Sequence, residues 1–74
     1  MMWIKRGDIL FNADEFSVIV ADREDYRIKA DTKDGKIITL YKARSEESLM
    51  RVYDHIVLMM AQDDMTIIRL PAED

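Results

Sequence analysis

Short apolar runs alternate with polar breaks over the first 42 residues, and this spacing predicts strands. "WIK" at 3–5 and "ILFN" at 9–12 flank Arg6-Gly7, which predicts a hairpin. "EFSVIVAD" at 15–22 is rich in β-branched residues and apolar on both faces, which is typical of a central strand. The polar stretch "DRED" at 22–25 then predicts a turn.

A second hairpin is predicted at "YRIKADTKDGKIITLYK", residues 26–42, around Asp34-Gly35. Both central residues of a type I′ turn need positive φ, which glycine adopts without a steric penalty. A two-residue turn centred there pairs Lys33 with Lys36. The expected core face is Tyr26, Ile28, Ala30, Ile37, Thr39 and Tyr41, and the opposite face, a possible second surface, is Arg27, Lys29, Ile38, Leu40 and Lys42.

Apolar positions change to helical spacing after Ser45, a favoured N-cap residue. Glu46 and Glu47 follow it, where carboxylates suit the positive end of the helix dipole. We expect the helix to end near Gln62 and the stretch "MTIIRLP" at 65–71 to form an edge strand. The predicted core stripe of the helix is Leu49, Val52, Tyr53, Ile56 and Met60.

The element order predicts an α+β fold. It is a small antiparallel β-meander of about five strands, covered by one helix in the C-terminal half and followed by a short final strand. At 74 residues, 1–74 is expected to be a single domain.

Composition narrows the classes of function. The chain has no cysteine, which removes disulfides and thiolate metal sites, and its formal net charge of −4 argues against a surface that neutralises phosphates. No apolar segment has the length of a signal peptide core or a membrane span, so we expect a cytoplasmic protein with no membrane contact. Because small domains need reinforcement and disulfides are absent, oligomerisation is expected.

The run "IVLMM" at 56–60 is apolar around the whole helix, although one sheet covers only one side of a helix. Leu58 points away from the core stripe and would stay exposed. We therefore expect a homo-oligomer, or a protein partner, on the outer face of the helix. The predicted interface residues are Met50, Val57, Leu58 and Ala61.

Each candidate catalytic or metal-binding group in the sequence is better explained by a structural role, as a turn, a loop or a helix surface residue. "DTKDG" lacks the Glu that follows the Gly in an EF-hand loop and is expected to be a hairpin turn. The acidic cluster at 22–25 is expected to be a solvated loop, and His55 is expected on the flank of the helix without a function. No activated nucleophile or phosphate-binding loop is visible, so the sequence predicts no enzyme, no cofactor and no metal.

A regulator that binds nucleic acid through the second surface is the alternative. Arg27, Lys29, Lys42 and Arg44 could form a basic stripe, and the order of short strands before a helix resembles the LytTR-type DNA-binding domain. That family relies on a basic surface, whereas this chain is acidic and has no aromatic side chain between these cations. We therefore do not expect a nucleic-acid partner.

Several stretches together resemble a known family: "MWIK", Asn12, "TLYKARSEESLMRVYDHI" and "IIRLP". The family consists of very small proteins in Firmicutes genomes and their prophages. Its members begin with Met-Trp-Ile/Val-Arg, carry a Thr-Leu-Gly-x-Tyr-x-Ser/Thr-x-Glu-x-Ala-Leu-x-Val-Leu-Asp-Glu-Ile block and end in a hydrophobic strand before Met-Pro. This chain departs from the pattern at Tyr41, Ala43 and Leu70. The resemblance implies a prophage or mobile-element context and carries no activity over to this chain.

Overall fold

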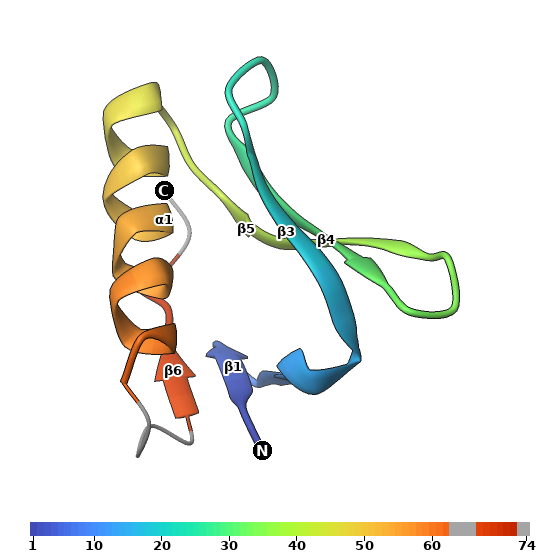
Figure 1. The fold of residues 1–74 in the computed structure, drawn as a ribbon. Helices are drawn as coiled ribbons and strands as arrows, with labels where there is room; N and C mark the ends of the chain where they lie inside the picture. The colour runs from blue at the N-terminus through green and yellow to red at the C-terminus, as the bar shows by residue number, and fades with distance from the viewer. Residues whose placement is uncertain (63–66, 73–74) are drawn as a thin grey trace.

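The fold is α+β, as predicted, and its elements follow the expected order of strands, helix and final strand. The computed structural model describes residues 1–62 and 67–72 of the 74-residue chain (Figure 1). Within those residues the elements are β1 (Trp3–Arg6), β2 (Ile9–Asn12), a 3-10 turn η1 (Ala13–Glu15), β3 (Phe16–Asp22), β4 (Arg27–Thr32), β5 (Ile37–Lys42), α1 (Glu46–Met60) and β6 (Ile67–Arg69).

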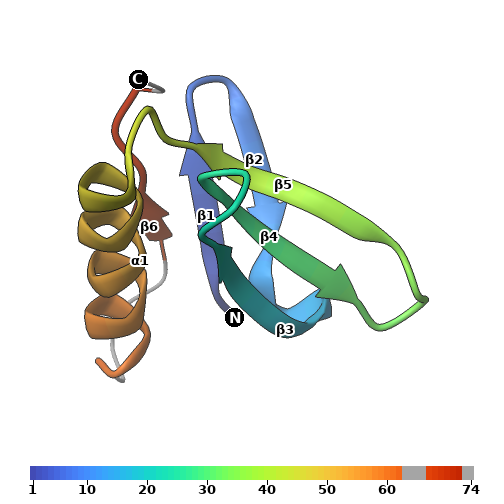
Figure 2. The same cartoon turned by 90° about the horizontal axis from the view of Figure 1, so that it is seen from above.

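The strands form two sheets rather than one meander. One sheet has the order β2-β1-β6 and the other the order β3-β4-β5. The break between them follows Asn12, whose side-chain oxygen accepts a hydrogen bond from the Asp14 backbone N–H at 3.1 Å and so caps η1. In Figure 2, α1 lies beside both sheets, with its first turns on the side of β5 and its last turns on the side of β3.

The first hairpin has a two-residue loop, because Arg6 pairs with Ile9. The loop is Gly7-Asp8, one residue later than predicted, and Gly7 has a φ of +56°. Glycine at the first central position is the hallmark of a type II′ turn, which suits the twist of the flanking strands.

The loop of the second hairpin has three residues and not two. Thr32 donates its backbone N–H to the Lys36 carbonyl at 2.8 Å, and Gly35 has a φ of +90°. This is the common three-residue loop with glycine in the left-handed position. Asp31 therefore pairs with Ile37, and the predicted register near the turn is wrong by one residue.

A β-bulge restores the predicted pairing further along this hairpin. Lys29 pairs with Thr39, but Ile28 pairs with Tyr41, so Leu40 is an extra residue on β5. As a result Leu40 and Tyr41 are both buried, whereas Ile37, predicted for the core, is 70% exposed. Leu40 therefore does not belong to an outer surface.

β3 is an edge strand, which corrects the prediction of a central one. It pairs only with β4 among the described strands, antiparallel, with a register shift between Phe16 and Val18. Ile19 and Ala21 are half-buried on the core side, while Val18 and Val20 are each 47% exposed. Only one face of β3 is therefore covered by the core, although both faces are apolar.

The helix begins as predicted. The Ser45 hydroxyl oxygen accepts a hydrogen bond from the Ser48 N–H at 3.1 Å, and Ala61 caps the other end, close to the predicted Gln62. The buried stripe is turned slightly from the predicted one, because Met60 is 37% exposed and Ser48 is buried instead. The core consists of Ile4, Ile28, Ala30, Leu40, Tyr41, Ala43, Leu49, Val52, Ile56, Ile68 and Leu70.

β6 lies at a sheet edge, as predicted, where it pairs with β1 in parallel. The Leu70 N–H continues the ladder by donating to the Lys5 carbonyl at 2.9 Å. The predicted strand residues Met65 and Thr66 lie outside the described residues. Because β1 and β6 come from opposite ends of the sequence, their pairing ties the helix to the first sheet.

Candidate interaction surfaces

Of the predicted interface residues on the outer face of α1, three are exposed to solvent and one is half-buried. Val57 is 50% exposed and Leu58 is 59% exposed, and Ala61 is also exposed. Met50 is only half-buried and packs against the core, so it contributes less apolar surface than predicted. Consecutive helical residues lie about 100° apart, so Val57 and Leu58 face different directions on the outer side of α1.

A shallow apolar groove lies between β3 and the second half of α1. Its volume is about 330 Å³, and Val57 and Met60 line its helix side. The remaining lining residues are Ala13, Phe16, Ser17, Val18, Ile19, Tyr53 and Ile56. We call this feature the β3–α1 groove.

Sequence reasoning missed the β3–α1 groove because it placed β3 inside a sheet. The signal that was present is the uncharged segment "FSVIVA" at 16–21, which is longer than the other uncharged strand runs. An uncharged, β-branched edge strand is a site for pairing with another strand. The position of β3 at the edge could not be obtained from the segment itself.

The possible second surface is not a continuous exposed face. Leu40 is buried by the bulge and Ile38 packs against the core, which corrects both assignments. Arg27 is half-buried and Lys42 is exposed. The geometry therefore brings together no basic stripe with apolar residues between its cations.

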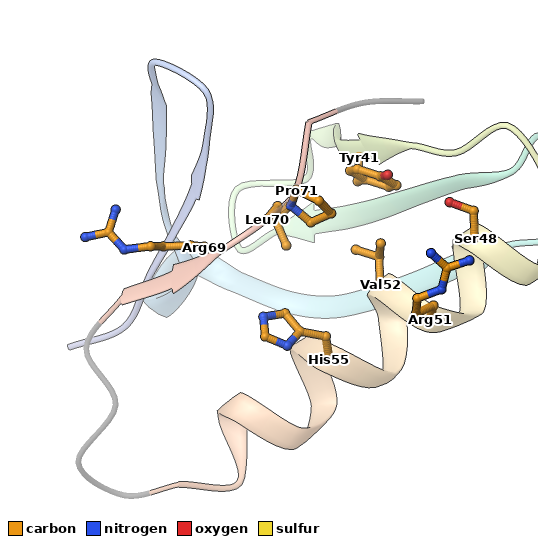
Figure 3. A pocket seen from close by; sticks show the side chains of 8 residues that line it. All are labelled: Tyr41, Ser48, Arg51, Val52, His55, Arg69, Leu70 and Pro71. Carbon is orange, nitrogen blue, oxygen red and sulfur yellow. The ribbon is translucent and has the colours of Figure 1, made fainter.

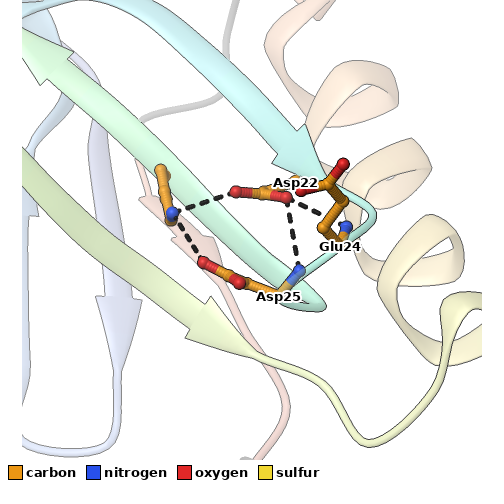
Figure 4. A network of polar contacts seen from close by, with 4 residues as sticks. Asp22, Glu24 and Asp25 are labelled. Atoms are coloured by element: carbon orange, nitrogen blue, oxygen red, sulfur yellow. Dashed lines mark hydrogen bonds and ion pairs between the residues drawn. The ribbon is translucent and has the colours of Figure 1, made fainter.

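Lys29 is held by the acidic turn that follows β3 (Figure 4). Its ammonium donates to Asp22 and to Asp25, each at 3.0 Å. The Asp22 carboxylate also accepts the backbone N–H groups of Glu24 at 3.0 Å and Asp25 at 3.3 Å. The acidic cluster is thus a turn closed by its own hydrogen bonds.

These hydrogen bonds shift the pKa values of Asp22 and Lys29 in opposite directions. The hydrogen bond from Lys29, followed by those from the backbone N–H groups of Asp25 and Glu24, holds the pKa of Asp22 below its ordinary 3.8. The hydrogen bonds to Asp22 and Asp25 raise the pKa of Lys29 above its ordinary 10.5. Lys29 therefore stays charged and engaged near neutral pH.

The stretch "DTKDG" forms a hairpin turn, as predicted. The Thr32 hydroxyl donates to the Asp34 carboxylate and accepts the Lys36 N–H at 2.9 Å. The hydrogen bond from Thr32 lowers the pKa of Asp34. Across the part of the chain that is described, no group of three or more His, Cys, Asp or Glu side chains is arranged to hold a metal ion.

A larger cavity, of about 510 Å³, lies between α1, β5 and the segment after β6 (Figure 3). Arg51 and His55 are one helical turn apart at its wall, and Arg51 is paired with Glu47 at 3.7 Å. The Arg69 side chain points away from both in Figure 3. The Tyr41 hydroxyl donates to the Ala72 carbonyl at 3.3 Å, so the C-terminal segment closes part of the cavity.

Comparison with protein-family models, with curated proteins and with solved structures finds no match for this chain. No helix within residues 1–62 and 67–72 is long and apolar enough to cross a membrane.

Proposed function

We propose that this chain is a non-enzymatic interaction protein that self-associates through the end of α1 and the adjacent edge of β3. The observation that carries the proposal is the meeting of an edge strand, uncharged over residues 16–21, with an apolar helix end at the β3–α1 groove. Single exposed apolar residues are ordinary on protein surfaces, but a contiguous patch of them marks an interaction site.

The exposed side chains alone would hold two copies together only marginally. Val18, Val20, Val57, Leu58 and Met60 are each between 37% and 59% exposed. Covering about half of such a side chain contributes about 1 kcal/mol, so the five on each of the two copies together contribute about 10 kcal/mol. Association costs about 4–15 kcal/mol in lost freedom, so backbone hydrogen bonds across the interface are needed as well. The open edge of β3 can supply them.

The second copy is a suitable partner because the apolar patch carries no charge of its own. Each copy has a net charge of −4, and repulsion between acidic surfaces is weakest where the contact itself is uncharged. A chain this short also gains a larger share of buried surface by pairing than a long chain does.

The test is the solution mass and its response to a charge at the groove. Sedimentation equilibrium should give twice the 8.7 kDa of one chain for the wild type. Val57→Glu should return the mass to that of one chain, because pairing would bury the new carboxylate. An unchanged circular dichroism spectrum and a cooperative thermal transition would show that the variant is folded.

Ile37→Glu is the matched control. Ile37 is more exposed than Val57 and lies on β5, away from the groove. This variant should keep the wild-type mass. A wild type that stays monomeric from micromolar to millimolar concentration would overturn the proposal, and so would equal loss of association in both variants.

A further inference from the structure

The outer edge of β3 lacks the features that normally keep an edge strand unpaired. Natural edges are protected by charged side chains, proline, bulges or covering segments. No charged residue and no proline occurs from Phe16 to Ala21. The register shift at Ser17 affects only the start of β3, and the pairing with β4 is regular from Val18 to Asp22.

We infer that β3 pairs antiparallel with β3 of a second copy, centred on Ile19, so that two three-stranded sheets become one sheet of six strands. This inference rests on the proposed self-association and specifies its geometry. It names the residues that lie opposite one another, which the proposed function does not require.

The register follows from the symmetry of the segment. When Ile19 lies opposite Ile19 of the second copy, Val18 lies opposite Val20, and the whole of Phe16–Asp22 is paired. Directly opposed β-branched residues stabilise antiparallel strands. The two valine pairs would cover side chains that are each 47% exposed in one copy.

Charge at the ends of β3 favours the same register. Glu15 directly precedes β3 and Arg23 directly follows it, so with Ile19 at the centre each Glu15 side chain lies near Arg23 of the second copy, and the two-fold axis repeats the pair at the other end. Both side chains are exposed, and Arg23 has only a 3.7 Å contact with Glu46 at the surface. Centring on Val20 instead would pair only Val18–Asp22, because the partners of Phe16 and Ser17 would be Glu24 and Arg23, which lie beyond the end of β3.

The added strand would also occupy the β3–α1 groove. Opposed residues point to the same face of a sheet, so Ile19 of the second copy points to the core side, as Ile19 itself does. That side is where Val57 and Met60 line the groove. Strand pairing and the cover of the helix end are therefore parts of one contact.

Cysteine cross-linking tests the register, because the chain has no cysteine of its own. Val18→Cys and Val20→Cys chains are mixed, with one of them ¹⁵N-labelled, and oxidised with copper phenanthroline. Opposed residues lie about 4.5–5.5 Å apart, within the Cα range of a disulfide, whereas diagonal ones lie about 7–8 Å apart. The mixture should therefore give mixed disulfide dimers in large excess over either variant alone.

Ile37→Cys, on an exposed position of the same sheet, measures the background from random collision. Efficient cross-linking of Val18→Cys alone or of Val20→Cys alone would overturn the register centred on Ile19. If the mass shows a dimer but the mixture gives only background, strand pairing is wrong while self-association stands. If the mass shows a monomer, both proposals fail.

Discussion

β3 and β5 are the two edge strands of one sheet, and their outer edges differ in cover and in the position of the bulge. The Arg6 guanidinium reaches across from β1 and donates to the Thr39 carbonyl at 3.1 Å and to the Leu40 carbonyl at 3.0 Å. Lys36 precedes β5, Lys42 is its last residue, and the bulge at Leu40 bends the strand. β3 has no comparable cover in residues 1–62 and 67–72.

If the sheet β3-β4-β5 gains a further strand, we expect it to do so at the β3 edge only. An edge that an arginine covers and a central bulge bends resists pairing, whereas an edge that is uncovered and regular from Val18 to Asp22 invites it. The same fold thus protects one edge with an arginine from the other sheet and leaves the opposite edge beside an apolar groove. This asymmetry would allow a closed dimer and disfavour a growing fibre.

The largest expected change in the free energy of unfolding comes from replacing Leu40, the bulge residue of β5. Leu40→Ala removes a fully buried side chain and should lower the free energy of unfolding by about 3 kcal/mol. Urea unfolding followed by circular dichroism measures the change.

Ile37→Ala provides the matched comparison on the same strand, because Ile37 is 70% exposed. It should change the free energy of unfolding by less than about 0.5 kcal/mol. A larger destabilisation by Ile37→Ala than by Leu40→Ala would contradict the bulged register and favour the two-residue turn.

A smaller effect is expected from Arg6, which covers the β5 edge. Arg6→Met keeps much of the apolar stem but loses two charge-assisted hydrogen bonds and the contact with the Phe11 ring at 5.5 Å. The free energy of unfolding should fall by about 2 kcal/mol. Lys5→Met, which loses a hydrogen bond to the Gly7 carbonyl next to the turn, should cost far less in the same urea experiment. A cost for Arg6→Met no larger than that of the control would mean that the arginine does not secure this edge.

Elements set by local chemistry could be predicted from the sequence. The hydroxyl of Ser45 caps α1, the acidic stretch after β3 closes into a turn, and Gly35 takes the positive φ of the second hairpin. Each of these depends on a few neighbouring residues. The α+β class and the order of the elements followed from the change of apolar spacing after residue 45.

Features set by contacts between distant segments could not be predicted. The parallel pairing of β1 with β6 joins the two ends of the chain, and no local pattern encodes it. Leu40 belongs to a core cluster that combines residues of both sheets and α1, so periodicity alone assigned it to the wrong face. The edge position of β3 depends on where the chain leaves the first sheet.

Only the helix side of the candidate interaction surface could be predicted from the sequence, because the strand side depends on contacts between distant segments. Helical geometry alone placed Leu58 and Val57 outside the core, and both are exposed. Met50, which was also placed outside the core, is half-buried and packs against it. The strand side of the β3–α1 groove was missed, since it requires knowing that β3 has only one neighbour.

Hydrogen–deuterium exchange at increasing protein concentration tests the contrast between the two edges most directly. As the copies associate, amides of Phe16–Asp22 that point outward from β3 should become protected, while those of Ile37–Lys42 should exchange at an unchanged rate. Two-dimensional NMR resolves the individual amides. New protection in β5, or association without new protection in β3, would contradict the account.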